Sequence, residues 1–151
     1  MTDLTPDQRA RQSWMGTLAK APPVRLEALM DALGDLPEAT WLQPPEVGTV
    51  MVRGRTGGTG AAFNLGEMSL TRCALRLTSG EVGHAYVQGR DKAHARRAAL
   101  IDALMQTDRA PELRAAVLEP LETEARAATL ARAQKAAATK VDFFTMVRGE
   151  D

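Results

Sequence analysis

Residues 86–106 read YVQGRDKAHARRAALIDALMQ, and the pattern in this stretch decides the fold. It predicts the end of a strand, a turn at Gly89, and a helix that begins after Asp91, whose carboxylate can cap the first helical turn. Apolar residues then recur at helical spacing, at Ala95, Ala98, Ile101, Leu104 and Met105. The stretch therefore predicts a strand that leads into an amphipathic helix lying on a core.

The start of the predicted helix is strongly basic. Arg90 precedes the capping residue, and Lys92, Arg96 and Arg97 add three positive charges within two turns. Helix N-termini also direct backbone N–H groups and the positive end of the helix dipole outward, an arrangement that binds anions. We therefore treat Arg90 and Lys92 as candidate anion- or substrate-binding residues. The alternative is ordinary α+β packing with no ligand.

The composition is that of one soluble globular domain. At 151 residues the chain is long enough for a single core, with 44% apolar and 25% charged residues. No run has the length of a membrane span, and the first residues lack the apolar core of a signal peptide. The single cysteine, Cys73, excludes an internal disulfide framework and is most simply a buried apolar residue, so we expect a cytoplasmic protein.

The net charge of zero hides an uneven distribution. Residues 53–97 hold eight Lys or Arg and three acids, a balance of +5, whereas the rest of the chain holds eleven basic and sixteen acidic residues, a balance of −5. A basic segment inside a neutral protein suggests a local anionic partner, and the alternative is a solvated basic face. Near-neutral charge and only 4% aromatic residues argue against a nucleic-acid-binding module.

The patterns along the whole chain predict a single α+β domain. We expect a small antiparallel sheet of about three to four strands, with a hairpin over 68–88 and an extended connection or short edge strand over 41–45. The predicted regions are N-terminal helices over 1–40, the sheet over 47–88, further helices over 91–139 and an extended apolar C-terminal tail over 140–151.

A glycine-rich loop, Arg55-Thr-Gly-Gly-Thr-Gly60, follows the strand predicted to end at Arg55. Glycines let backbone N–H groups approach an anion closely. Gly57 and Gly58, with Arg53 and Arg55 beside them, are therefore further anion- or substrate-binding candidates. The spacing matches neither a dinucleotide-binding fingerprint nor a P-loop. The alternative is a plain flexible connection.

His94 is the candidate catalytic residue. It lies near the helix start, three residues after Asp91, where an imidazole can act in acid–base chemistry or hold a phosphate. Its spacing of seven residues from Ile101 also places it on the buried face of the helix, which favours a structural histidine. The two histidines and Cys73 lack metal-ligand spacing, so no metal site is predicted.

The tail concentrates large apolar side chains behind a long Ala-rich helix. These side chains must be buried, either in the core of this domain or against a partner subunit, and we favour a partner. In the isolated chain such an arm can instead swap onto a second copy. The partner-docking candidates are Phe143, Phe144, Met146 and Val147.

Six stretches, spread over nearly the whole chain, form a recognisable pattern. They are Arg11-Gln-Ser-Trp-Met15, Arg55-Thr-Gly-Gly-Thr-Gly60, Leu70-Thr-Arg-Cys-Ala-Leu-Arg-Leu77, Val87-Gln-Gly-Arg-Asp-Lys92, Ala99-Leu-Ile-Asp-Ala-Leu-Met-Gln106 and Val141-Asp-Phe-Phe-Thr-Met-Val-Arg-Gly149. In this order they resemble the PhnG family, the G subunit of the bacterial carbon–phosphorus lyase core complex.

The resemblance implies a role in phosphonate breakdown under phosphate starvation. With the H, I and L proteins, the family supports attack of a phosphonate on the ribose C1′ of ATP, which releases adenine. A separate J subunit later cleaves the carbon–phosphorus bond. The resemblance also implies a hetero-oligomer with the H, I and J subunits, ATP as a substrate of the complex, and no cofactor bound by this chain. It carries over no catalytic residue.

These observations lead to two hypotheses. The primary one is an accessory, assembly-forming subunit of a phosphonate–ATP transferase, inactive on its own. The rival is a direct contribution to catalysis or substrate binding, with His94 and Arg90 acting at a site shared with a partner. We expect neither a membrane nor a nucleic acid as partner.

Overall fold

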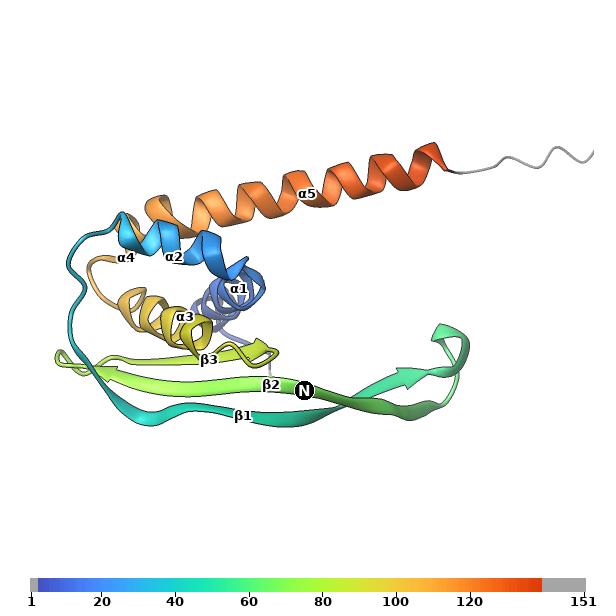
Figure 1. Cartoon of the computed structure of the whole chain (residues 1–151), viewed down its shortest axis with the longest axis horizontal. Helices are drawn as coiled ribbons and strands as arrows, with labels where there is room; N and C mark the ends of the chain where they lie inside the picture. Colours follow the sequence, from blue (N-terminus) through green and yellow to red (C-terminus); the bar gives the residue numbers. More distant parts are fainter. Residues whose placement is uncertain (1–2, 140–151) are drawn as a thin grey trace, which may run out of the picture.

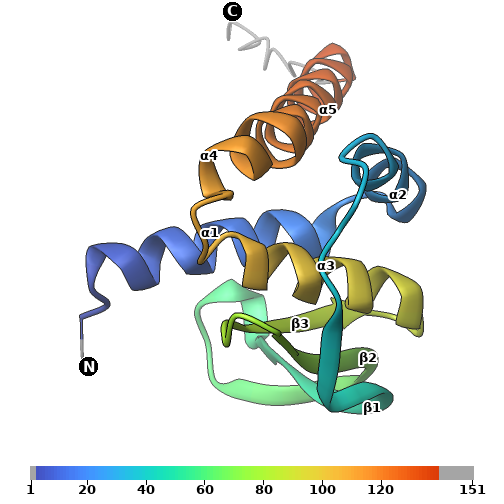
Figure 2. The same cartoon turned by 90° about the vertical axis from the view of Figure 1, so that its left-hand side faces the viewer.

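The computed structural model describes residues 3–139, which form an α+β domain built in layers. A three-stranded antiparallel sheet, in the order β1-β2-β3, forms one layer. The helix α3 (Lys92–Leu104) packs on one face of the sheet with α1 (Pro6–Lys20) alongside (Figure 1). Farther from the sheet lie α2 (Pro23–Asp31) and α5 (Glu119–Ala138), as Figure 2 shows. The predicted fold class is confirmed.

The strands extend beyond the predicted sheet region. β1 spans Ala39–Arg55, β2 spans Ala62–Leu77 and β3 spans Val82–Gln88. The segment over 41–45 is therefore part of β1, so the sheet begins at Ala39 and not at residue 47. Pro44 and Pro45 fit within β1 because it is an edge strand, and the pairing register shifts on both sides of Gln43.

Two hairpins build the sheet. β2 and β3 form the hairpin predicted over 68–88, with pairs that run from Leu70↔Gln88 to Arg76↔Val82. β1 and β2 form a longer hairpin that runs to the pair Arg55↔Ala62. The glycine-rich loop, with the short helix η1 (Thr56–Gly58), is the turn of this second hairpin.

The helices after α3 follow one another without a break. They are α4 (Ala110–Leu113), η2 (Arg114–Leu118) and α5. η2 is a single π-helical turn that ends two residues before Pro120, whose ring removes one N–H from the continuing helix. Among the described residues, no helix is both long and apolar enough to cross a membrane.

The core lies between α3 and the inner face of β2 and β3. All five residues predicted for the apolar face of α3 are buried, and Asp91 caps the helix by accepting a hydrogen bond from the His94 N–H at 2.8 Å. α3 approaches β3 most closely at Gly83, where a Cβ would lie 1.9 Å from the carbonyl oxygen of Ala99. Helices outside α3 contribute Leu18, Leu26, Leu113, Val117 and Leu118.

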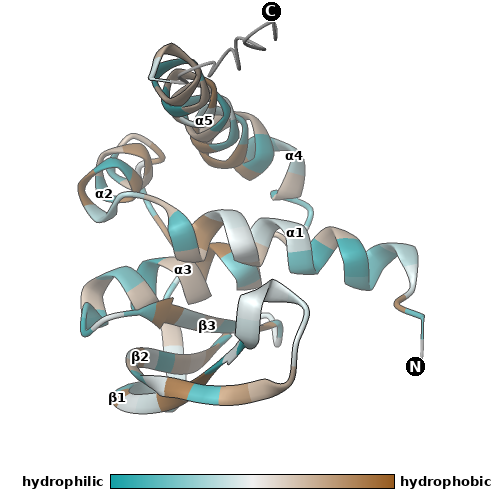
Figure 3. Ribbon diagram, turned by 90° about the vertical axis from the view of Figure 1, so that its right-hand side faces the viewer, coloured by the Kyte–Doolittle hydropathy of each residue, from teal (hydrophilic) through white to brown (hydrophobic). Residues whose placement is uncertain are grey.

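Two parts of the chain project from this body toward the same end of the molecule. β1 and β2 continue past the end of β3 as a two-stranded hairpin (Figure 1). α5 is exposed from Thr123 to the end of the described residues. Figure 3 looks at this end of the molecule and shows apolar stretches on the projecting strands.

Candidate functional site

The predicted anion-binding residues lie at two separate places. Arg90 and Lys92 flank the cap of α3, whereas the glycine-rich loop and its arginines lie at the tip of the β1–β2 hairpin. The Gly89 N–H, just after β3, donates to the Ser69 carbonyl oxygen of β2 at 2.9 Å. The tip residue Ala62 lies seven residues farther along β2, about 23 Å of extended strand. A single small anion cannot contact both groups.

The start of α3 carries two exposed cations. Within residues 3–139, the side chains of Arg90 and Lys92 take part in none of the five ion pairs. The carboxylate of Asp91 already places a negative charge at the helix N-terminus and satisfies one of its N–H groups. The two cations are therefore available to an anionic partner, while the helix terminus itself is occupied by its own cap.

His94 lies in the core, on the face of α3 that its spacing predicts. Its side chain is 3% exposed, and its Nε2 lies 2.8 Å from the carbonyl oxygen of Leu18. This hydrogen bond connects α3 to the C-terminal half of α1. The contact supports the structural interpretation of the histidine, and a role in catalysis stays a prediction.

The glycine-rich loop is closed by its own backbone. Gly57 and Gly58 have φ values of 60° and 82°, a region that favours glycine, so both are required by the turn. The Gly60 N–H donates to the Thr56 carbonyl oxygen at 2.8 Å, and the Arg55 guanidinium donates to the Gly60 carbonyl oxygen at 3.2 Å. The conformation is accounted for by hairpin geometry, and anion binding by this loop stays a prediction.

A buried carboxylate that the sequence patterns do not single out lies on α3. Asp102 is 0% exposed and accepts hydrogen bonds from the Arg11 guanidinium at 2.7 and 3.1 Å, from the Trp14 indole at 2.8 Å and from the His84 backbone N–H at 2.9 Å. The Arg11 guanidinium also donates to the Val82 carbonyl oxygen at 2.9 Å. This cluster fixes α1 and β3 to α3. An acid within the apolar pattern of a helix is the signal that could have indicated it.

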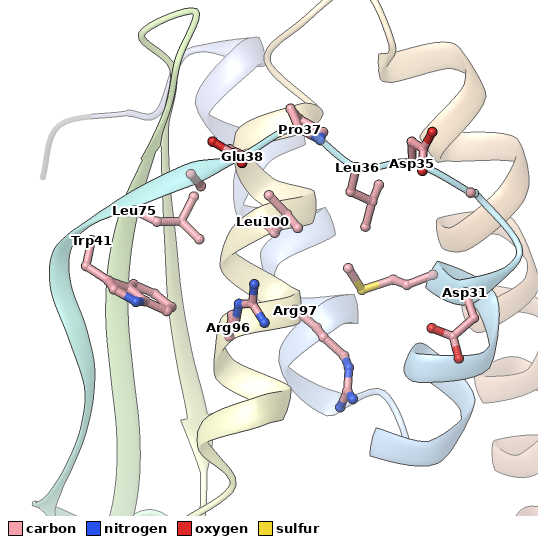
Figure 4. A pocket seen from close by; sticks show the side chains of 13 residues that line it. Asp31, Asp35, Leu36, Pro37, Glu38, Trp41, Leu75, Arg96, Arg97 and Leu100 are labelled. Carbon is pink, nitrogen blue, oxygen red and sulfur yellow. The ribbon is translucent and has the colours of Figure 1, made fainter.

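A pocket of about 880 Å³ lies where the segment after α2 crosses to β1 (Figure 4). Leu75 and Leu100 belong to its apolar lining, and Trp41 of β1 borders it. Two of its charged residues, Arg96 and Arg97, are cationic, and Arg97 pairs with Glu27 on α2. Its acidic residues are Asp31, Asp35 and Glu38. Because three acids outnumber two cations, one of which is already paired, the pocket is not selective for an anion.

Cys73 is buried on the inner face of β2, as predicted, with 2% of its surface exposed. Burial raises the pKa of its thiol to about 11, so little of the nucleophilic thiolate forms at neutral pH. Over residues 3–139, no group of three or more His, Cys, Asp and Glu side chains is arranged to hold a metal ion. The docking candidates Phe143, Phe144, Met146 and Val147 lie outside the described residues.

Comparisons with known proteins give a consistent result. The family model for phosphonate metabolism protein PhnG matches residues 9–149. A relative from Rhizobium meliloti (strain 1021), the alpha-D-ribose 1-methylphosphonate 5-triphosphate synthase subunit PhnG, is 46% identical over 141 residues, which cover 93% of this chain and 90% of the relative. The similarity therefore includes the sheet, both projecting parts and the start of α3.

Proposed function

This chain belongs to the family of phosphonate metabolism protein PhnG, and on that premise we propose that it is a subunit of an α-D-ribose 1-methylphosphonate 5-triphosphate synthase. The observation that carries the proposal is 46% identity to such a subunit across 93% of the chain. The product named for the relative is what remains of ATP when methylphosphonate replaces adenine at C1 of the ribose. ATP and a phosphonate are therefore the proposed substrates of the complex.

The role we assign to this chain is accessory and assembly-forming. Its buried polar side chains are occupied within the fold, since His94 contacts Leu18 and Asp102 holds Arg11 and Trp14. Its projecting hairpin and helix offer surface to other proteins. The proposed partners are the H, I and J subunits and the L protein. The chain on its own is expected to be inactive.

The proposal is tested by adenine release from ATP and methylphosphonate. The assay compares H, I and L proteins with wild-type chain, without it, and with Arg55→Ala, Arg90→Ala and Lys92→Ala combined. Arg9→Ala, Lys20→Ala and Arg114→Ala combined form the matched control, because all six side chains are exposed cations. Sedimentation verifies that each variant assembles.

An accessory subunit predicts that omission abolishes adenine release, while the control triple variant assembles and reacts within about twofold of wild type, since exposed side chains rarely affect the fold. The first triple variant should react at the same rate per assembled complex. Equal activity without this chain would refute its role in the synthase. If the first triple variant assembles but fails to react, while the control variant assembles and reacts, the chain contributes to substrate binding.

The tail is the proposed docking segment for a partner. Phe143→Ala combined with Phe144→Ala removes two large apolar side chains, so we expect the chain to sediment separately from the other subunits. Intact assembly of this variant would show that the tail is not the docking segment.

A direct contribution to substrate binding is the second candidate function. It is favoured by Arg90 and Lys92, two exposed cations outside the five ion pairs of the described residues. A triphosphate bound by a neighbouring subunit would be attracted to them. In the assay above, a rise in KM for ATP with unchanged kcat would identify this role.

A further inference from the structure

β3 pairs with only about half the length of β2. β3 pairs with β2 from Arg76 to Leu70, and one further hydrogen bond joins Gly89 to Ser69. β2 continues to Ala62 and remains paired with β1, with one register shift between Val52 and Arg53 that leaves Leu65 without a paired residue. Within residues 3–139, no strand pairs with residues 62–68 of β2 on the side that β3 occupies farther along. Figure 1 shows β1 and β2 running past the end of β3. We refer to this side of residues 62–68 as the open edge.

The hairpin that carries the open edge has no core of its own. None of the residues from Thr49 to Glu67 is buried. Two-stranded hairpins are marginally stable in water unless a third strand or another element packs on them. Large apolar side chains are nevertheless exposed here, with exposed fractions of 51% for Met51, 44% for Phe63 and 67% for Leu65. Exposed apolar residues on an unpaired strand are typical of a surface that another protein covers.

The other free edge of the sheet is less suited to strand addition. β1 forms that edge, and Pro44 and Pro45 interrupt it, because proline has no N–H for a ladder. Residues 62–68 contain no proline and a single charged residue, Glu67. Of the two edges, the open edge of β2 is the one that accepts a strand.

Cations lie at both ends of the open edge. Arg55 and Arg53 of β1 pair with Ala62 and Asn64 near the hairpin tip, across β2 from the open edge, and Arg90 and Lys92 follow the end of β3. None of these four side chains is in an ion pair within the described part of the chain. The two groups of cations are too far apart to bind one small anion, but a single strand added beside residues 62–68 would have one group near each of its ends.

We propose that the open edge of β2 pairs with a β-strand from another subunit of the synthase, an apolar strand with acidic residues toward its ends. Strand addition supplies backbone hydrogen bonds along about 23 Å of β2, and apolar side chains of the added strand cover Phe63 and Leu65. Acidic residues at the two ends meet the four cations. The identity of the partner as a synthase subunit rests on the proposed function, whereas the open edge does not.

A second copy of this chain does not fit the open edge. Antiparallel pairing of two open edges would place Arg53 and Arg55 of one copy beside Arg90 and Lys92 of the other. Like charges would then meet at both ends, which is destabilising. Parallel pairing is blocked, because β2 of each copy would run into the position that β3 of the other copy occupies.

Hydrogen–deuterium exchange of residues 62–68 tests strand addition directly. Amides on an unpaired edge exchange rapidly, whereas amides in a ladder are protected. We expect exchange at this segment to slow at least ~tenfold when the chain joins the H, I and L proteins. In the isolated chain, whose oligomeric state is followed by sedimentation, the amides of the open edge should exchange rapidly. If the isolated chain sediments as a dimer and residues 62–68 are protected in it, a second copy fills the edge and the proposal is overturned.

A variant with acidic residues at exposed positions provides the second readout. Phe63→Glu combined with Leu65→Glu should weaken binding to the other subunits at least ~tenfold, as for central apolar residues of an interface. Val24→Glu is the matched control, because Val24 is 78% exposed on α2, away from the hairpin, and it should change binding by less than ~twofold.

The two proposals fail in different ways. If the wild-type chain joins the complex and supports adenine release while residues 62–68 exchange as before, strand addition is wrong and the proposed function stands. The same conclusion follows if the Phe63→Glu and Leu65→Glu variant binds like wild type. If the wild-type chain does not join the complex, both proposals are overturned.

Discussion

Asp102 is the residue on which three separate elements converge. A fully buried carboxylate is unfavourable unless its oxygens are hydrogen-bonded and a cation is near. Both oxygens of Asp102 are used, by Arg11 and Trp14 of α1 and by the backbone of β3. The Arg11 side chain is 33% exposed and reaches water, whereas the Asp102 carboxylate is fully buried. The pair thereby attaches α1 to the sheet and α3.

Removing the cation from this pair should be costly. We expect Arg11→Ala to lower the free energy of unfolding by about 3 kcal/mol, because it leaves the Asp102 charge buried without its partner. Arg9→Ala is the matched control, since Arg9 is exposed on the same helix and should cost less than ~0.5 kcal/mol. Urea denaturation measures both variants. Equal midpoints for the two would show that the pair does not stabilise the fold.

The thiol of Cys73 makes stability depend on pH in the alkaline range. Its folded-state pKa of about 11 lies above the unfolded value near ~8.5, so the folded state prefers the neutral thiol. Stability is therefore unaffected below pH ~8.5 and decreases as pH rises toward 11, by up to ~1.4 kcal/mol per pH unit. Cys73→Ala should lack this component, so the difference in unfolding free energy between the two proteins should change above pH ~8.5. A pH-independent difference would contradict the buried thiol.

At the residue scale, local signals were sufficient for some predictions and not for others. The Asp91 cap and the burial of His94 follow from spacing within one helix, and the structure confirms both. The role of Asp102 as a buried partner of Arg11 could not be predicted, because Arg11 lies 91 residues away in the sequence. The separation of Arg55 from Arg90 depends on the register of β2, which a charge pattern does not contain.

At the scale of elements, the contact between α3 and β3 is set by a glycine. A Cβ at position 83 would lie 1.9 Å from the Ala99 carbonyl oxygen and 2.8 Å from the Ala103 nitrogen, both in the backbone of α3. Neither atom can move without displacing the helix. The absence of a side chain at Gly83 is therefore what lets α3 lie close to the sheet.

Gly83→Ala should accordingly destabilise the protein by at least ~1–3 kcal/mol, the usual cost of overpacking. Gly48→Ala in β1 is the matched control, because nothing lies within 4 Å of its Cβ position and its backbone is not left-handed. It should leave stability unchanged or raise it slightly. Thermal unfolding compares the two. Equal melting temperatures would mean that α3 does not pack as closely as described.

The length of β1 shows why element boundaries were harder to predict than element types. Pro44 and Pro45 interrupt the alternation expected of a strand, so the sequence predicts an extended connection or a short edge strand over 41–45, separate from the strand that begins at Val47. The structure continues β1 through them because β2 pairs with Trp41 and Gln43 across register shifts. Pairing between strands outweighs local propensity here.

At the scale of the whole molecule, a stable body carries two projecting parts that add little to its core. The body contains every buried side chain of the described residues, the last of them Leu121 at the base of α5. A half-exposed ion pair at 2.8 Å between Arg25 and Glu124 adds a contact at that base. The sequence predicted an α+β domain but not the projections, because projection is decided by where tertiary contacts end.

Shortening the hairpin separates the body from its projecting strands. Replacement of residues 51–67 by Asn-Gly joins the directly paired residues Val50 and Met68 through a two-residue turn. Because no residue in 51–67 is buried, the free energy of unfolding should change by less than ~1 kcal/mol, as measured in urea. The same variant should fail to join the H, I and L proteins, since it lacks the open edge. A large loss of stability would show that the hairpin supports the core, and normal assembly would show that partners bind elsewhere.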